Sequence, residues 1–151
     1  VDLKAQQQGN NILVYDTAPF SSEQTIVGQP GLELSVATTA EATDFVARLS
    51  WLKPDGSATF LCMAAASTNQ ERIGENNAYS LKLKFDATAV CIPVGDQLRL
   101  DIASSAFPLI ARHPNTKADR LGLLNQSHFK RARQTVYHDT ARPSRLKLPT
   151  L

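Results

Sequence analysis

Serine, histidine and aspartate side chains are the residues of this sequence that could perform hydrolytic chemistry together. A hydrolase of that kind needs an activated nucleophile beside a base. The sequence supplies these residue types in Asp101, His113 and either Ser104 or Ser105. Their spacing along the chain resembles a catalytic triad no more than chance would produce. The sequence also contains no G-x-S-x-G motif, the strand–turn–helix device that exposes a catalytic serine. We therefore predict no catalytic residue in this chain.

Histidine and cysteine are the residues to consider for a metal site. The three histidines, His113, His128 and His138, lack a zinc-like spacing such as H-x-x-x-H. The two cysteines, Cys62 and Cys91, form no CxxC or Cys/His pair. Both lie in apolar, strand-like runs, so we expect buried thiols. The sequence predicts neither a metal nor a cofactor.

Aromatic side chains could bind a sugar ring, as in many β-sandwich modules. Aromatic residues make up only 7% of the chain. The single tryptophan, Trp51, shares a predicted strand face with Phe45 and Leu49, which favours a place in the core. The tyrosines are scattered through separate strands: Tyr15, Tyr79 and Tyr137. A free-standing carbohydrate-binding module is the alternative function that we keep open.

Alternating apolar and polar residues indicate the strands that must position these groups. Leu81, Leu83 and Phe85 point one way, while Lys82 and Lys84 point the other. By the same pattern Arg48, Ser50, Arg99 and Asp101 face away from the core. We expect strands at residues 12–15, 25–27, 32–36, 45–52, 57–63, 80–86, 97–103, 134–138 and 146–148.

Turn residues separate these strands. Lys53-Pro54-Asp55-Gly56 predicts a hairpin between residues 45–52 and 57–63, because Pro presets φ and Gly accepts a positive φ. Residues 111–133 show no alternation and form either a long loop or a loop with a short helix near residues 121–129. About nine short strands predict an all-β sandwich or jelly roll.

The length of 151 residues fits one domain. We expect residues 1–11 to be a cut edge or linker and residues 12–151 to be the domain. The first ten residues contain three consecutive glutamines and do not resemble a signal peptide. No stretch approaches the roughly 20 apolar residues that span a bilayer, so we expect no membrane partner.

Charge is distributed unevenly along the chain. Residues 1–110 carry 7 Lys and Arg against 12 Asp and Glu, a net charge of −5, whereas residues 111–151 carry 9 against 2, a net charge of +7. The spacing of Lys130, Arg131 and Arg133 is too short for a phosphate-binding stripe, so we expect no nucleic acid partner. An acidic partner or water facing the basic segment is the interpretation that we favour.

Several ordered sequence blocks resemble the C-terminal domain of X-Pro dipeptidyl-peptidase and cocaine-esterase type hydrolases, the CocE/NonD family. The most distinctive are Thr43-Asp-Phe-Val-Ala-Arg-Leu49 followed by Pro54-Asp-Gly56, then Ser104-Ser-Ala-Phe-Pro108 and Arg112-His-Pro-Asn-Thr116. The resemblance spans about residues 12–151 and ends in Pro143-Ser-Arg-Leu-Lys-Leu-Pro149.

The resemblance implies a jelly-roll, galactose-binding-like sandwich that packs on an α/β-hydrolase domain and shapes its substrate cleft, while the triad belongs to that other domain. The catalytic domain is thus the expected partner, in the same chain or a separate one. The candidate interface residues are Ser105, Phe107, Arg112, His113 and Asn115. Phe107 is either an exposed anchor for this partner or a cap on the sandwich.

Two departures from the family pattern stand out. Met63-Ala-Ala-Ala-Ser67 replaces a run that usually contains Gly and Arg, and the strand that normally precedes residue 12 is missing or lost in residues 1–11. The edge of one sheet would then be exposed. Because an exposed edge strand can pair with a strand of another copy of the chain, we keep a homo-oligomer as an alternative. The compartment is undecided, with the cytoplasm slightly favoured.

Overall fold

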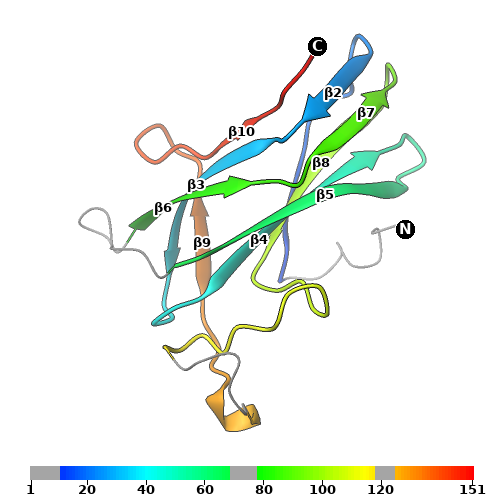
Figure 1. The fold of residues 1–151 in the computed structure, drawn as a ribbon. Helices are drawn as coiled ribbons and strands as arrows, with labels where there is room; N and C mark the ends of the chain where they lie inside the picture. The colour runs from blue at the N-terminus through cyan, green and yellow to red at the C-terminus, as the bar shows by residue number, and fades with distance from the viewer. Residues whose placement is uncertain (1–10, 69–77, 118–124) are drawn as a thin grey trace.

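A computed structural model describes residues 11–68, 78–117 and 125–151 of the chain. Nearly all of its regular structure is strand (Figure 1). Within the described part, no helix is long and apolar enough to cross a membrane. The elements are β1 (Leu13–Asp16), β2 (Gln24–Gly28), β3 (Gly31–Thr38), β4 (Asp44–Leu52), β5 (Ala58–Ser67), β6 (Ala78–Lys84), β7 (Thr88–Ile92), β8 (Gln97–Ala103), the 3-10 helix η2 (Gln126–His128), β9 (Gln134–Tyr137) and β10 (Arg145–Lys147).

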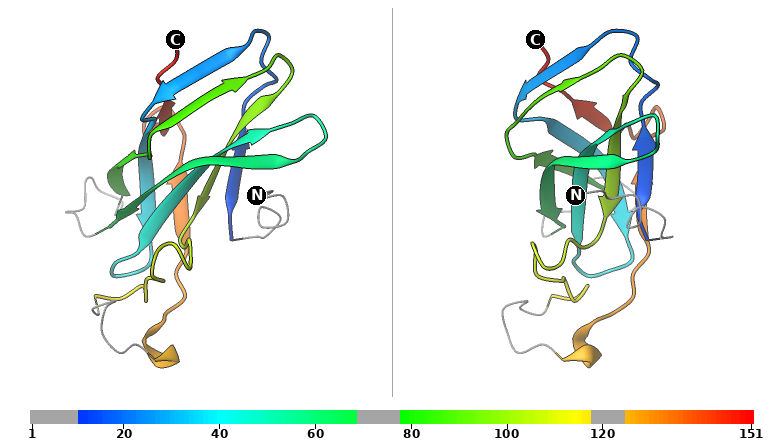
Figure 2. Two further views of the ribbon diagram at one scale, coloured as in Figure 1. Left: turned by 45° about the vertical axis from the view of Figure 1, so that its right-hand side comes forward. Right: turned by 90° about the vertical axis from the view of Figure 1, so that its right-hand side faces the viewer.

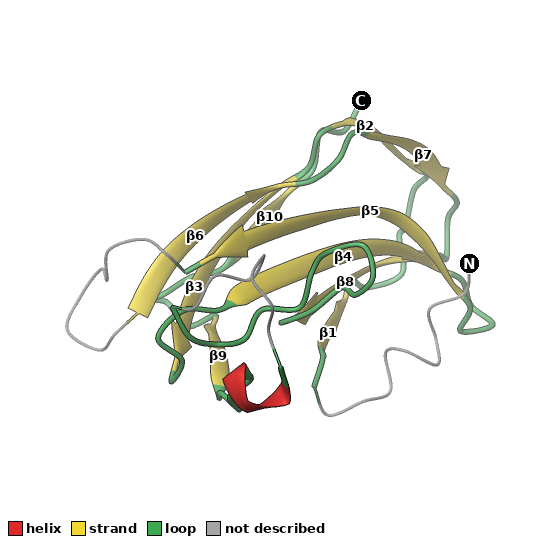
Figure 3. Cartoon of the chain, turned by 60° about the horizontal axis from the view of Figure 1, so that its bottom comes forward, coloured by secondary structure: helices red, strands yellow, loops and turns green. Residues whose placement is uncertain are grey.

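The strands form two packed sheets and a two-stranded ribbon. One sheet has the order β1-β8-β4-β5, the other has β10-β3-β6 with β9 also paired to β3, and β2 pairs with β7. Every pair is antiparallel. The two sheets lie face to face in an all-β sandwich, as the alternation predicts (Figures 2 and 3). The finer jelly-roll, galactose-binding-like topology stays a prediction.

The core lies between the inner faces of the two sheets. In β6, Leu81 and Leu83 are buried while Lys82 is exposed, so the predicted alternation is confirmed. Phe45 and Leu49 of β4 face them from the other sheet. Full burial of each such side chain contributes about 1.5–3 kcal/mol.

The predicted hairpin joins β4 and β5. The Lys53 N–H donates to the Ser57 carbonyl at 2.9 Å and the Gly56 N–H donates to the Lys53 carbonyl at 2.9 Å. Gly56 has a φ of 80°, which a residue without a Cβ adopts at little cost. The Asp55 carboxylate accepts the Ser57 N–H at 2.8 Å. The turn residues therefore act as their chemistry predicts.

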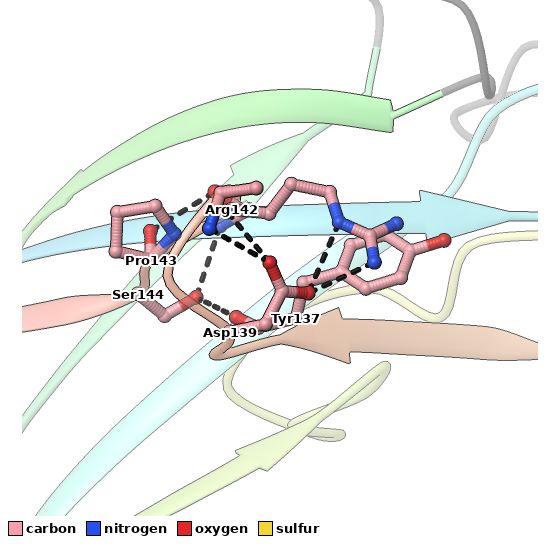
Figure 4. A network of polar contacts seen from close by, with 7 residues as sticks. Tyr137, Asp139, Arg142, Pro143 and Ser144 are labelled. Carbon is pink, nitrogen blue, oxygen red and sulfur yellow. Dashed lines mark hydrogen bonds and ion pairs between the residues drawn. The ribbon is translucent and has the colours of Figure 1, made fainter.

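β9 and β10 lie end to end along one edge of β3, and a compact loop joins them (Figure 4). Ser144 Oγ accepts the Ser35 N–H at 3.0 Å and donates to the Tyr137 carbonyl at 2.6 Å, so one hydroxyl bridges the break between the two ladders. Asp139 pairs with Arg142 at 2.8 Å, and the Arg142 guanidinium lies 3.6 Å from the centroid of the Tyr137 ring. These contacts fix the far edge of the second sheet.

The strand β7 is not among the strands expected from sequence. It pairs along its whole length with β2, from Thr88 opposite Gly28 to Ile92 opposite Gln24. This register turns Cys91 outward beside Thr25, whose hydroxyl lies 3.8 Å from the Cys91 sulfur. The expectation of a buried Cys91 is therefore wrong, whereas Cys62 is buried as expected.

The outer face of the first sheet is largely covered. Arg48 and Asp101 lie opposite each other in the β4–β8 ladder and form a 2.7 Å ion pair, in which Asp101 is fully buried. Ser50 on the same face is also fully buried. Alternation correctly gives the side of the sheet to which these residues belong, but this side is not a solvent-facing surface.

Candidate functional site

The segment between β8 and β9 contains all five residues expected to form an interface. Its described parts, residues 104–117 and 125–133, are called the lobe below. The lobe lies at the end of the sandwich opposite the β2–β7 ribbon (Figures 1 and 2). The short helix expected near residues 121–129 is represented by η2, while residues 118–124 lie outside the described part.

Asn115 ties the two parts of the lobe to the sandwich. Its φ of 63° lies in the left-handed region that asparagine tolerates better than most residues. Its side-chain oxygen accepts the Thr43 hydroxyl at 2.8 Å, and its amide nitrogen donates to the Lys130 carbonyl at 2.7 Å. The Lys130 N–H donates to the Pro114 carbonyl at 2.9 Å. Asn115 therefore holds the lobe rather than presenting a free side chain.

Thr43, fully buried just before β4, is the sandwich residue to which the lobe is attached. Besides donating to Asn115, its hydroxyl accepts the side-chain amide of Gln134, the first residue of β9, at 2.9 Å. Its backbone N–H donates to the Thr68 hydroxyl at 2.9 Å. One threonine thus joins β4, the end of β5, the lobe and β9.

His113 is only 8% exposed and also belongs to the interior of the lobe. Its Nδ1 accepts the Asn115 N–H at 3.0 Å. In a Ser-His-Asp triad that nitrogen carries a proton and donates a hydrogen bond to the carboxylate, which stays ionised. Because Nδ1 is an acceptor here and Asp101 is paired with Arg48, His113 and Asp101 do not have the geometry of a triad.

The turn that follows β8 presents large apolar side chains to solvent. The Ile110 N–H donates to the Ala106 carbonyl at 3.1 Å and closes the turn. Phe107 is 75% exposed and Leu109 is 76% exposed, and Ser105 nearby is exposed too. Sequence reasoning identified Phe107 but missed Leu109, although the apolar run after Pro108 in a loop without alternation was a usable signal.

The lobe that contains these apolar residues is also rich in basic side chains. The described lobe contains five Lys and Arg residues, no Asp or Glu, and hence a net charge of +5. All five are exposed: Arg112, Lys117, Lys130, Arg131 and Arg133. The Arg112 guanidinium lies 4.9 Å from the centroid of the Phe129 ring, a cation–π distance that orders this side chain. The lobe combines apolar anchors with positive charge.

The aromatic rings considered for sugar binding are engaged within the domain. Trp51 is half-buried, its indole N–H donates to Asp96 at 2.6 Å, and the Lys53 ammonium lies 5.3 Å from its ring centroid. Tyr79 is buried. Tyr137 has Arg142 stacked on its ring, and Tyr15 meets the His138 ring edge to face with a centroid distance of 6.2 Å. These rings do not form an open stacking platform for a sugar.

Comparison with known proteins matches residues 3–147 to a family model described as the X-Pro dipeptidyl-peptidase C-terminal non-catalytic domain. The chain is 26% identical over 152 aligned positions to a cocaine esterase from Rhodococcus sp. (strain MB1 Bresler), covering 94% of this chain and 26% of the esterase.

Solved structures of larger hydrolases contain the same fold. An α-amino acid ester hydrolase matches 99% of this chain and 27% of its own, with a TM-score of 0.84 and 19% identity. An aminopeptidase from a marine sediment archaeon, Thaumarchaeota archaeon, matches 97% of this chain and 27% of its own, with a TM-score of 0.81 and 17% identity. The chain therefore spans about a quarter of the length of these relatives.

Proposed function

This chain belongs to the family of X-Pro dipeptidyl-peptidase C-terminal non-catalytic domains, and from that premise we propose that it packs on an α/β-hydrolase domain and shapes the substrate cleft of that domain. The hydrolase so formed acts on peptide or ester bonds, with its triad in the α/β domain. The observation that carries the proposal is the lobe, which contains the exposed side chains of Phe107 and Leu109 and five exposed basic side chains.

The lobe has the composition of a protein–protein contact surface. Exposed aromatic and aliphatic side chains that lie together mark interaction sites, and interfaces are enriched in aromatic residues and arginine. Phe107, Leu109, Ser105 and Arg112 are exposed, so we propose that these residues touch the partner. His113 and Asn115 support the contact indirectly, because they fix the loop from inside.

The sandwich holds this surface in a fixed geometry. The 2.8 Å hydrogen bond between Thr43 and Asn115 ties the lobe to the residue just before β4, and the 2.7 Å hydrogen bond between Asn115 and Lys130 ties the two parts of the lobe to each other. A contact surface that is ordered before binding loses less conformational entropy when the partner docks. A rigid lobe can also line one wall of a cleft without moving during the reaction.

The proposal predicts that this chain alone does not hydrolyse X-Pro dipeptide or short-chain ester substrates. Purified chain should show no turnover above the buffer rate in a chromogenic assay of either substrate class. Robust turnover that a single point mutation abolishes would overturn the proposal.

Hydrogen–deuterium exchange tests the contact surface itself. Docking of a separately produced α/β-hydrolase domain should protect the backbone amides of residues 105–112 and leave the β4–β5 turn unchanged. Protection confined to the β4–β5 turn or the β2–β7 ribbon would move the interface away from the lobe and contradict this assignment.

The carbohydrate-binding alternative makes a different prediction. A sugar module should give glycan-array signals that disappear when one exposed aromatic residue is replaced. Because Trp51, Tyr79 and Tyr137 are engaged within the domain, we expect a silent array.

A further inference from the structure

We propose that a cavity between the two sheets is a binding pocket for a small, uncharged and largely apolar molecule. The cavity has a volume of about 250 Å³. Leu32 and Leu34 of β3 line it from one sheet, and Leu98 and Ile102 of β8 line it from the other. All four are at most 4% exposed, so the cavity reaches into the core of the sandwich. The proposal does not depend on the partner domain discussed above.

The mouth of the cavity lies between β1 and the end of β9. Tyr15 is 37% exposed and His138 is exposed, in contrast to the buried leucines behind them. Their rings meet edge to face, with centroids 6.2 Å apart and an interplanar angle of 76°. A ligand would therefore enter between the Tyr15 ring, which carries a hydroxyl group, and the imidazole ring of His138.

Hydrogen bonds on both sides keep the cavity from collapsing. On the β1 side, Asp16 pairs with Arg99 at 2.6 Å and the Thr17 hydroxyl accepts the Leu98 N–H at 3.0 Å. On the β9–β10 side, Ser144 bridges Ser35 and Tyr137 (Figure 4). These bonds hold the two walls in place, so a ligand can enter a cavity that already has its shape.

The lining determines the chemistry of this occupant. The leucine and isoleucine floor offers no hydrogen-bond partner to a sugar hydroxyl, and burying a charge there would be costly. Two charged side chains also line the cavity: Asp16 is already paired with Arg99, and Arg145 is exposed to solvent rather than part of the leucine floor. A tyrosine hydroxyl is protonated at neutral pH, and burial raises the pKa of Tyr15 further, so this hydroxyl is available as a donor. These features fit an apolar body with one polar group held at the mouth.

The volume limits the size of the ligand. An apolar cavity of about 150 Å³ holds benzene, so the larger cavity here accommodates one aromatic ring with a short alkyl chain. We choose 4-ethylphenol as the probe, because it has such a body, a single hydroxyl and no charge at neutral pH. For a molecule of this size, a dissociation constant on the order of 1 mM or lower is expected.

The experiment titrates 4-ethylphenol into the 151-residue chain and follows the methyl groups of Leu, Ile and Val by ¹H–¹³C NMR. Saturable shifts should be largest at Leu34, Ile102 and Val136, which line the cavity. Galactose and the cationic analogue tyramine should bind at least tenfold more weakly, because the floor offers no hydrogen-bond partner and Arg145 at the lining repels a cation. Absence of saturable shifts, shifts centred elsewhere, or equal binding of galactose would overturn the proposal.

Variants that fill the cavity provide the matched test. Val136→Phe on β9 and Leu146→Phe on β10 should each weaken 4-ethylphenol binding at least tenfold, whereas Val94→Phe, at an exposed position outside the cavity, should not. If neither filled variant folds, His138→Ala at the exposed mouth should still weaken binding several-fold. Unchanged affinity in the folded variants would contradict the assignment.

Discussion

At the residue scale, Thr43 is the side chain on which the position of the lobe depends most. Its hydroxyl is fully buried, donates to Asn115 at 2.8 Å and accepts from Gln134 at 2.9 Å. A buried polar group that loses its partner costs about 1–3 kcal/mol. Removal of one hydroxyl would leave polar atoms of two other residues without that partner.

We therefore predict that Thr43→Ala lowers the free energy of unfolding by about 2–3 kcal/mol. Thr43→Ser keeps the hydroxyl and should lose less than half of that amount. Urea denaturation followed by circular dichroism measures both. Equal losses for the two variants would show that the methyl group, and not the hydroxyl, is responsible.

Ser50 is the opposite case, a buried hydroxyl with no hydrogen-bond partner among the described residues. Ser50→Ala removes a desolvated hydroxyl without breaking a hydrogen bond, so we expect the free energy of unfolding to rise by about 0.5–1 kcal/mol. Ser67→Ala is the control, because Ser67 Oγ donates to Asp44 at 2.6 Å and its loss should be destabilising. A clear loss of stability in Ser50→Ala would contradict this account.

The two thiols should differ in reactivity. Desolvation raises the pKa of Cys62 to about 11, and this thiol is buried. Cys91 is exposed, although a hydrogen bond with Glu23 raises its pKa as well. Iodoacetamide followed by mass spectrometry should modify Cys91 alone in the native protein, faster as pH rises because the thiolate is the nucleophile. Equal labelling of both cysteines without denaturant would refute this.

Sequence patterns at this scale give the direction of a side chain but not its surroundings. Alternation places Ser50 and Asp101 on the outer face of their sheet, yet both are buried there. The apolar run after Pro108 indicated an unusual loop, but the exposure of Leu109 depends on the turn that the Ile110 N–H closes with the Ala106 carbonyl.

At the scale of elements, Ser144 joins β9 and β10 into one continuous edge along β3. Because its hydroxyl stands between the Ser35 N–H and the Tyr137 carbonyl, Ser144→Ala should destabilise the fold by about 1–2 kcal/mol. The Ser35 amide should also exchange with deuterium faster. Ser105→Ala, at an exposed position, should change stability by less than about 0.5 kcal/mol. Slow exchange at Ser35 in Ser144→Ala would contradict the bridging role.

All nine expected strands are present because each carries its own alternation or turn signal. The tenth, β7, was missed because its sequence Thr-Ala-Val-Cys-Ile has only weak alternation, and its register is set by β2 more than 60 residues earlier in the chain. The length of β5 was also underestimated: Ala64, Ala65 and Ala66 have little strand signal alone but pair with β4. Whether such a segment forms a strand depends on its pairing with a strand that is distant in the sequence.

At the scale of the whole molecule, the described chain divides into the β-sandwich and the lobe, and positive charge is concentrated in the lobe. The sandwich contributes a rigid scaffold, and the lobe concentrates five basic side chains with two exposed apolar ones at one end of it. The uneven charge was visible in the sequence, but the joining of residues 104–117 and 125–133 into one lobe was not, because it depends on the hydrogen bond between Asn115 and Lys130. We expect docking of a partner with an acidic surface to weaken as ionic strength rises.

The most direct test of this account is the affinity of the chain for a separately produced α/β-hydrolase domain, measured by isothermal titration calorimetry. The account predicts saturable binding that weakens with salt and that falls at least tenfold in the double variant Phe107→Ala/Leu109→Ala, because buried apolar anchors dominate interface energies. Phe60→Ala, a partly exposed phenylalanine on β5, should leave the affinity unchanged. No detectable binding, or binding that the double variant does not weaken, would contradict a domain that docks through its lobe.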